Sequence, residues 1–292
     1  MRLVAIGGGH GTAVTLRALR GISRDVTGIV SVADDGGSTG RLRAMLNVAA
    51  VGDLRKCLGA LADAHNPLAQ AFEHRFDVGE LAGHTVGNLF LVGLIDATGD
   101  LEASVDAAAR ALGVTGTIVP ASRQGVVLVA SHDQGVTRGQ TAVARTPGIH
   151  FLSLDPPSAP APARALRAIE EADVILIGPG SLFTSVLAAC VVPDINRALA
   201  VSLARKVYVA NLRPEDPETL DFSLQDHVDA LRAHGVEPTD VLVDSASPFA
   251  AQACQIHTTI APLTARNPLV HDVPKLRQAV VDACDIQPPN CS

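Results

Sequence analysis

Short apolar runs that break at glycines set the pattern of this chain. Residues 3–6 are apolar, residues 7–12 contain four glycines, and the stretch after them carries Leu16 and Leu19 three positions apart. This order predicts a buried strand that turns sharply into a helix. Residues 26–33 alternate Val, Ile and small side chains and predict a second strand. A strand, a glycine turn, a helix and a strand make a parallel βαβ unit, so we expect an α/β sheet.

The same pattern returns in the second half of the chain. Residues 174–177 are wholly apolar, residues 178–180 are Gly-Pro-Gly, and Ser181 is placed to begin a helix. Two further strands are expected, over residues 206–212 and 241–245. In open parallel sheets the loops after the strands form the ligand-binding edge, so we expect the glycine turns to face the same site.

The middle of the chain has a different sequence pattern. Proline, glycine and charged turns separate four β-like runs, at 117–119, 126–131, 141–144 and 150–154. They predict a small β-rich insertion, roughly residues 114–155, within a single domain over residues 1–292. Helices are expected at 89–96, 101–112, 163–172, 223–234 and 275–283. The predicted fold class is an α/β, Rossmann-like three-layer sandwich with a mainly parallel sheet.

Composition narrows the classes of function. The 292 residues are 47% hydrophobic but only 3% aromatic, and the net charge is -7. With no basic excess and few rings for stacking on bases, nucleic acid is not an expected partner. Five scattered cysteines without a Cys-x-x-Cys pair favour the reducing cytoplasm. The apolar runs are too short for a membrane span or a signal peptide, so membrane insertion is not expected.

The glycine turns favour an anionic ligand, most simply a phosphate. Glycine lets the backbone approach a bound group closely, and a helix start offers unpaired N–H donors with a partial positive charge. The dinucleotide pattern G-x-G-x-x-G is not met, because its third glycine falls on Thr12 or Val14. A Walker A loop is not met either, because no lysine stands between Gly11 and Thr12. Close packing of strand and helix remains the alternative explanation of the first turn.

Polar segments after the strands supply further candidates. Residues 34–41 combine two aspartates, three glycines, two hydroxyls and an arginine, a composition that an ordinary solvated turn would also have. Asp53 is placed to cap a helix, and Arg55 lies in its first turn, where an arginine needs an anion or a carboxylate nearby. His84 lies between two glycines and is either a structural histidine or part of the cleft.

Six segments therefore contribute candidate ligand-binding residues. They are Gly8, Gly9, Gly11, Thr12, Asp34, Asp35, Gly36, Ser38, Arg41, Asp53, Arg55, His84, Asn88, Gly178, Gly180, Ser181, Leu182, Thr184, Ser185 and Asn211. Asp34 and Asp35 are also candidate Mg²⁺ ligands, although consecutive strand residues point to opposite faces and one of the two is expected to reach the ion. No catalytic residue and no required cofactor are assigned.

Six motifs in this order resemble one known family. They are residues 7–12, the block Val-Ala-Asp-Asp-Gly-Gly-Ser-Thr-Gly-Arg-Leu-Arg at 32–43, Gly-Asp-Leu-Arg at 52–55, Gly-His with Gly-Asn-Leu at 83–89, Gly-Pro-Gly-Ser-Leu-Phe-Thr-Ser at 178–185, and His-Asp at 271–272. Together they resemble the YvcK-type gluconeogenesis factors, which are relatives of CofD, the 2-phospho-L-lactate transferase. The resemblance covers nearly the whole chain.

The resemblance implies a CofD-like fold that binds UDP-N-acetylglucosamine or a related nucleotide sugar. It implies a regulatory role linking carbon flow to cell-wall precursor supply and cell shape, through a regulatory protein partner that the sequence does not identify; a homodimer is a candidate assembly. By position, residues 7–12 and 178–185 would hold the diphosphate, and residues 34–41 would take the nucleotide or an ion.

The chain departs from the family pattern at three places. Val51 stands where the family has a proline, and Val270 stands where it has an arginine. A tyrosine of the family pattern has no counterpart between residues 247 and 269, a segment that is also shortened. The arginine and the tyrosine face the ligand in the family pattern, so these departures bear on ligand specificity rather than on the fold.

Two other functions stay open at this point. A CofD-like transferase would bind Mg²⁺ through Asp34 and Asp35 and neutralise a diphosphate while an acceptor hydroxyl attacks; His84 and Asp53 are its candidate bases. An NAD-dependent dehydrogenase is suggested by the acidic pair that begins 23 residues after Gly11, where a ribose-binding carboxylate belongs. The glycine spacing disfavours this third function.

Overall fold

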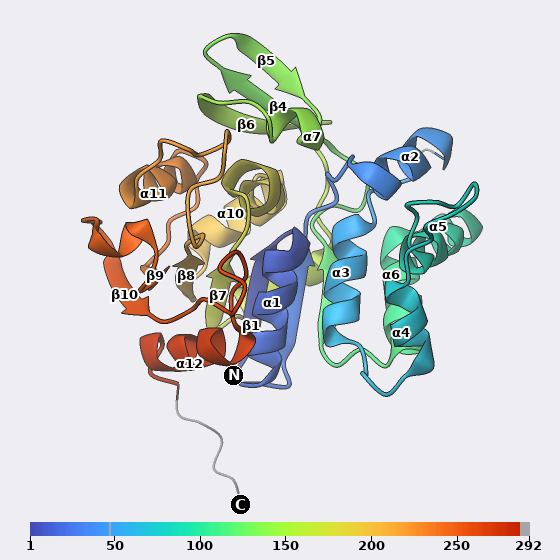
Figure 1. Cartoon of the computed structure of the whole chain (residues 1–292), viewed down its shortest axis with the longest axis horizontal. Coiled ribbons are helices and arrows are strands. Elements are labelled where there is room, and N and C mark those ends of the chain that lie inside the picture. The colour runs from blue at the N-terminus through green and yellow to red at the C-terminus, as the bar shows by residue number, and fades with distance from the viewer. Residues whose placement is uncertain (47, 287–292) are drawn as a thin grey trace, which may run out of the picture.

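The main sheet has seven strands, all parallel, in the order β10-β9-β8-β7-β1-β2-β3. The computed structural model describes residues 1–46 and 48–286 (Figure 1). The strands are β1 Leu3–Gly7, β2 Val26–Val30, β3 Thr117–Pro120, β7 Val174–Ile177, β8 Arg205–Val209, β9 Asp240–Asp244 and β10 His257–Ala261. The expected α/β class with a mainly parallel sheet is confirmed.

Helices cover both faces of this sheet. They are α1 Gly9–Arg20, α2 Gly37–Leu46, α3 Gly52–Leu61, α4 Pro67–Glu73, α5 Val86–Thr98, α6 Leu101–Leu112, α8 Ala163–Glu170, the π-helical η1 Leu182–Leu187, α9 Ala188–Cys190, α10 Pro193–Val201, α11 Leu224–Ala233, the 3-10 helical η2 Pro248–Ala251 and α12 Val273–Ala283. Figure 1 shows α1, α3 and α12 in front of the sheet and α10 behind it. The result is the predicted three-layer sandwich.

The order of the strands reverses beside β1. The chain runs from β1 outward to β2 and β3, returns to the other side of β1 as β7, and then continues outward to β8, β9 and β10. Ligands of open α/β sheets bind at such a reversal, beyond the carboxyl ends of the strands. Both strands at the reversal lead into helical segments, α1 after β1 and η1 after β7.

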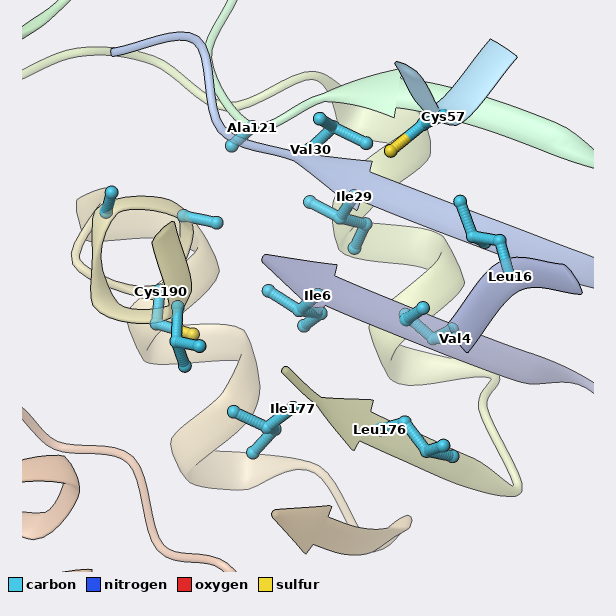
Figure 2. Packing of buried hydrophobic residues seen from close by; sticks show 14 of the residues in the cluster. Val4, Ile6, Leu16, Ile29, Val30, Cys57, Ala121, Leu176, Ile177 and Cys190 are labelled. Atoms are coloured by element: carbon cyan, nitrogen blue, oxygen red, sulfur yellow. The ribbon is translucent and has the colours of Figure 1, made fainter. Parts of the chain in front are cut away.

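Aliphatic side chains from the central strands fill the core. Ile6 of β1 stands opposite Ile29 of β2 and Ile177 of β7, and all three are fully buried. Figure 2 shows these side chains next to one another along the neighbouring strands β2, β1 and β7, with Leu16 of α1 and Cys190 of α9 contributed by the helices. Burying each such aliphatic side chain is worth about 1.5–3 kcal/mol, so the low aromatic content does not prevent a large core.

A second sheet has three antiparallel strands in the order β5-β4-β6. They are β4 Val127–His132, β5 Gly135–Arg138 and β6 Ile149–Asp155, with a short helix α7 Gln140–Val143 between the last two. Figure 1 shows this small sheet standing above the main sheet with α7 at its base. The small sheet begins at residue 127 rather than near 114, because the strand predicted at 117–119 is β3 of the main sheet and pairs with β2.

The extended run predicted at 141–144 is wrong, because this segment forms α7. Asp35 Oδ1 accepts hydrogen bonds from the backbone N–H of Thr141 at 2.8 Å and from Thr141 Oγ1 at 2.6 Å. Gly139, with φ +93, turns the chain into the helix. Asp35 lies 106 residues before Thr141 in the sequence, so local propensity does not predict these contacts or the helix that they hold.

Within the described residues, no single helix is long and apolar enough to cross a membrane. The segments Leu182–Cys190 and Pro193–Val201 meet that test only as a pair, and the pair is bent by 79°. Phe183, Leu187 and Cys190 of this pair are buried in the core.

Candidate functional site

A cleft of about 1000 Å³ lies beyond the carboxyl ends of the central strands. The loops after β1, β2, β7 and β8 line it, and α7 of the small sheet borders it. Ten predicted site residues line this cleft: Gly8, Gly9, Gly11, Asp34, Asp53, Gly180, Ser181, Thr184, Ser185 and Asn211. The structure therefore brings together segments from both halves of the chain, as the strand reversal requires.

The two glycine turns touch each other directly. A Cβ on Gly11 would lie 2.0 Å from the backbone oxygen of Pro179, so only glycine fits between α1 and the second turn. Thr15 Oγ1 donates a hydrogen bond to the Gly178 backbone oxygen at 2.9 Å. The Gly180 N–H donates to Asn211 Oδ1 at 3.0 Å. The second turn is thereby fixed to α1 on one side and to the residues after β8 on the other.

The N-terminus of α1 opens on the cleft. The helix begins at Gly9, its first turn contains no acidic residue, and no side chain among the described residues caps it at Gly8. Gly9 has φ +69, a conformation that favours glycine. Thr12 does not line the cleft, because its Oγ1 donates to the Gly8 backbone oxygen at 3.0 Å and the side chain is buried. The first amide groups of α1 are therefore suited to an anion.

The start of η1 differs, because a carboxylate of the protein already occupies it. Glu218 accepts hydrogen bonds from the backbone N–H of Phe183 at 2.6 Å, from the N–H of Thr184 at 3.2 Å and from Thr184 Oγ1 at 3.0 Å. Glu218 is 3% exposed. No motif in the sequence marks Glu218, and the sequence pattern predicts equivalent anion sites at the two glycine turns. In the structure they are not equivalent.

The environment of Glu218 makes ionisation costly. Burial raises the pKa of Glu218 to about 7, and the charge of Glu215 adds to this, while the bonds from Phe183 and Thr184 lower it. Burial also raises the pKa of Glu215 above its ordinary value. Both carboxyl groups line the cleft, so protonation of either one would make this wall less repulsive to an anion.

The variant Glu218→Gln is expected to change how stability depends on pH. Because the folded-state pKa of about 7 lies above the ordinary 4.5, the folded wild type holds a proton that the unfolded chain releases. Wild-type stability should therefore fall, relative to the variant, as the pH rises from 4.5 to about 7. Urea unfolding of both proteins across this range measures the difference; a constant difference would contradict the assignment.

Two acidic residues, Asp34 after β2 and Asp53 in α3, line the cleft on the β2 side of α1, and Asp53 Oδ2 would lie 2.5 Å from a Cβ on Gly8 at the start of that helix. Asp34 lines the cleft, and burial, then the neighbouring charge of Asp53, raises the pKa of Asp34. Asp53 accepts from Lys56 Nζ at 2.9 Å. Asp53 is not the helix cap that the sequence predicted: Val51 holds that position and Asp53 lies in the first turn of α3. Its side chain is thus free to face the cleft.

Asp34 and Asp35 point to different places, as consecutive extended residues should. Asp35 is engaged by Thr141 of α7, whereas Asp34 faces the cleft and also accepts the Gly36 N–H at 2.9 Å. No group of three or more His, Cys, Asp or Glu residues in the described part of the chain is placed to hold a metal ion. A cation in this cleft would therefore need ligand oxygens besides Asp34.

Three predicted site residues form a buried network of their own outside the cleft. Asn88 Nδ2 donates to Ser38 Oγ at 3.0 Å, and Ser38 Oγ lies 2.9 Å from His84 Nδ1. Burial, and then the charges of Arg41 and Arg75, lower the pKa of His84 and so favour its neutral form. This network joins α2 to the start of α5. His84 is therefore a structural histidine and not part of the cleft, which is one of the two interpretations that its sequence context allows.

The two predicted arginines also have partners within the protein. Arg41 Nη2 donates to the Ala82 backbone oxygen at 2.7 Å. Arg55 forms an ion pair with Glu73, which supplies the carboxylate that an arginine in a first helical turn requires. The remaining predicted residues do not line the cleft: Asp35, Gly36, Gly178 and Leu182. Leu182 is a core side chain with no exposed surface.

Twelve residues that line the cleft lie outside the motifs and candidates found in the sequence: Lys56, Gln140, Thr141, Ala144, Arg145, Leu212, Arg213, Pro214, Glu215, Asp216, Glu218 and Leu269. His10, Pro179 and His271 also line it and belong to the motifs at 7–12, 178–185 and 271–272. Residues 212–218 follow β8 directly, so the rule that placed Asn211 at the sheet edge could have found them. Burial, then the charges of Lys56 and Arg55, lowers the pKa of His10. Residues 140–145 carry no local signal for this position.

Acidic and basic side chains line the cleft, and the acidic ones are in excess. The acidic residues are Asp34, Asp53, Glu215, Asp216 and Glu218, of which Glu218 has its pKa raised to about 7, and the cations are Lys56, Arg145 and Arg213. An anionic ligand must therefore bind where backbone amides and cations outweigh these carboxylates, or arrive with a cation of its own.

The fold and the cleft define a member of one protein family. Residues 3–286 match the family model described as 2-phospho-L-lactate transferase CofD, and the chain belongs to this CofD family. Within the family it is similar to proteins named gluconeogenesis factor. Its identity is 39% to the one from Halalkalibacterium halodurans, over 85% of this chain and 78% of that protein. Identity to the Bacillus subtilis protein is also 39%, over 80% and 74% of the two chains.

Other comparisons agree with this assignment. A relative from Nostoc sp. is 43% identical over 80% of this chain, and the match spans only 52% of that longer protein. A crystal structure from Bacillus halodurans, described as a member of the UPF0052 family, superposes with a TM-score of 0.89 at 34% identity. That comparison covers 96% of this chain and 98% of the other.

Proposed function

We propose that this protein is a nucleotide-sugar-binding regulator whose ligand is UDP-N-acetylglucosamine or a close relative. The observation that carries the proposal is the uncapped start of α1, which opens on the cleft beside the second glycine turn. Amide groups at such a helix start favour phosphate oxygens. A cleft of about 1000 Å³ has room for a nucleotide sugar in addition to the phosphates.

The regulatory part of the proposal is based on the relatives of this chain that are named gluconeogenesis factor. Under this proposal the protein acts in the cytoplasm, and occupancy of the cleft links central carbon metabolism to cell-wall precursor supply and cell shape. A regulatory protein would read the occupied state, and a homodimer is a candidate assembly. No catalytic step is needed for this function.

The acidic lining supports a role for Mg²⁺ with the ligand. A diphosphate close to Asp34 would meet the charges of Asp34 and Asp53, and a divalent ion held by Asp34 and phosphate oxygens would offset that repulsion. The same observation favours one alternative function, a CofD-like transferase of a phosphate-linked group, in which the ion would stabilise charge on the diphosphate leaving group.

A thermal-shift panel tests the proposed function. The wild type is heated with UDP-N-acetylglucosamine, UDP-glucose, GDP, GTP or NAD, each with and without Mg²⁺. A ligand at a thousand times its dissociation constant adds about 4 kcal/mol of stability, so UDP-sugars should raise the melting temperature clearly. Long incubation followed by chromatography should return the ligand unchanged; turnover of a nucleotide would favour the transferase.

Two variants connect the shift to the cleft. Gly9→Val should abolish the shift, because Gly9 has φ +69 and its amide belongs to the uncapped helix start. Cys254→Ser, outside the cleft, should keep it. A wild-type shift with NAD alone, or a normal shift in Gly9→Val, would argue against the proposal.

A further inference from the structure

Two buried polar atoms at the β8 side of the cleft have no hydrogen-bond partner among the described residues. They are Asn211 Nδ2 and His271 Nε2. Both residues line the cleft, and they are only 6% and 8% exposed. Folded proteins rarely leave buried polar atoms unpaired, because the loss of hydration is not offset. Unlike the other unpaired buried atoms in the described part of the chain, these two belong to residues that line the cleft, where a ligand group could pair with them.

The orientation of Asn211 is fixed by a hydrogen bond. Its Oδ1 accepts the Gly180 N–H at 3.0 Å, which assigns the oxygen and nitrogen of the amide. Nδ2 therefore carries N–H donors that require an acceptor. Since Gly180 belongs to the second glycine turn, this donor has a fixed position relative to the place where phosphates are expected.

His271 offers an uncharged partner beside it. Burial lowers the pKa of His271 to about 4, although the Ala210 backbone and the charge of Asp244 act in the opposite direction. The ring is neutral at physiological pH, so it suits a hydrogen bond with an uncharged group better than a phosphate. The ring contacts the backbone of Ala210, which directly precedes Asn211, and both residues line the same cleft.

We infer that Asn211 and His271 recognise the hydrogen-bonding edge of a nucleobase. Such an edge presents an acceptor beside a donor, which matches the Asn211 amide and a neutral imidazole. Leu212 and Leu269 line the cleft as well and give apolar surface for the face of a base. This inference rests on the proposed function and adds to it the orientation of the ligand in the cleft, with the base at the end next to β8.

The direction follows from the order of the strands. Asn211 comes after β8 and Asp34 after β2, and the strands β7 and β1 lie between them. With the base at β8 and the phosphates at the start of α1, the sugar reaches the side of Asp34. The Asp34 carboxylate can accept hydrogen bonds from sugar hydroxyls.

Base selectivity tests this inference. UDP, CDP, GDP and ADP share the ribose and the diphosphate and differ only in the base. Calorimetric titration of the wild type should separate the tightest from the weakest of the four by about tenfold or more. Two variants remove the proposed contacts to the base. His271→Phe removes the ring nitrogens, and Asn211→Asp keeps the acceptor for the Gly180 N–H but loses the donor. In each variant the ratio of the weakest to the tightest dissociation constant should shrink at least about fivefold. Any general effect of the added charge in Asn211→Asp cancels in the ratio.

The outcomes separate this inference from the proposed function. If the wild type binds no nucleoside diphosphate and no UDP-sugar, the proposed function fails and this inference fails with it. If the wild type binds UDP-N-acetylglucosamine but both variants keep the wild-type ratio, or the wild type does not distinguish the bases, only the inference fails. Melting temperatures of the ligand-free variants show whether a lost ratio reflects a lost fold.

Discussion

Gly11→Ala is expected to force the two glycine turns apart and to lower the free energy of unfolding by about 2–3 kcal/mol. The new Cβ would lie 2.0 Å from Pro179 O and 2.7 Å from Pro179 C, both of them backbone atoms. Because these atoms belong to the turn that also holds Asn211, relief of the clash would widen the cleft. Urea unfolding measures the loss of stability, and the thermal shift with UDP-N-acetylglucosamine should disappear.

Gly93→Ala is the matched control for this variant. Gly93 lies inside α5, and a Cβ there meets nothing within 4 Å. Since alanine is the better helix former, this change should leave the protein unchanged or stabilise it by up to about 1 kcal/mol. If Gly11→Ala unfolds at the wild-type urea concentration, the tight contact between the turns does not exist in solution.

Glu218→Ala is expected to cost about 3 kcal/mol of stability. Three hydrogen bonds end at its carboxylate, and their donors are two backbone amides and one hydroxyl at the start of η1. Alanine would leave Phe183 and Thr184 with buried, unpaired donors. Chemical denaturation measures the loss, and η1 should show faster amide hydrogen exchange than α1 in the variant.

An exposed glutamate provides the comparison. Glu237 pairs with Arg232 at 3.2 Å, and its side chain is 64% exposed. Such a pair contributes little, so Glu237→Ala should stay within about 0.5 kcal/mol of the wild type. Equal effects of the two substitutions would show that Glu218 does not stabilise η1.

The sequence predicted the elements whose signals are local. Buried parallel strands are apolar along nearly their whole length, which is why the runs that became β1 and β7 stood out, whereas β2 was predicted from its alternation of Val, Ile and small residues. The helix α6 was predicted with its observed bounds, because Asp100 caps its start and Gly113, with φ +62, ends it. The place of the cleft followed from the glycine turns together with the rule for parallel sheets.

Partners that lie far apart along the chain could not be predicted. Glu218 stands 35 residues beyond the Phe183 amide that it accepts from, and no motif links the two. Ser38 and His84 have residue types that suit a ligand, yet the fold pairs them with each other across 46 residues. A sequence identifies which side chains can make hydrogen bonds; the fold decides which of them remain available.

The reversal of strand order beside β1 bears on how the protein folds. One wall of the cleft comes from the start of the chain and the facing wall from residues beyond 178, so neither half contains a complete site. A ligand that spans α1 and Asn211 would couple the unfolding of the two halves, and hydrogen exchange in β2 and in β9 should slow together when it binds. Ligand occupancy would then set the folding cooperativity of the whole domain.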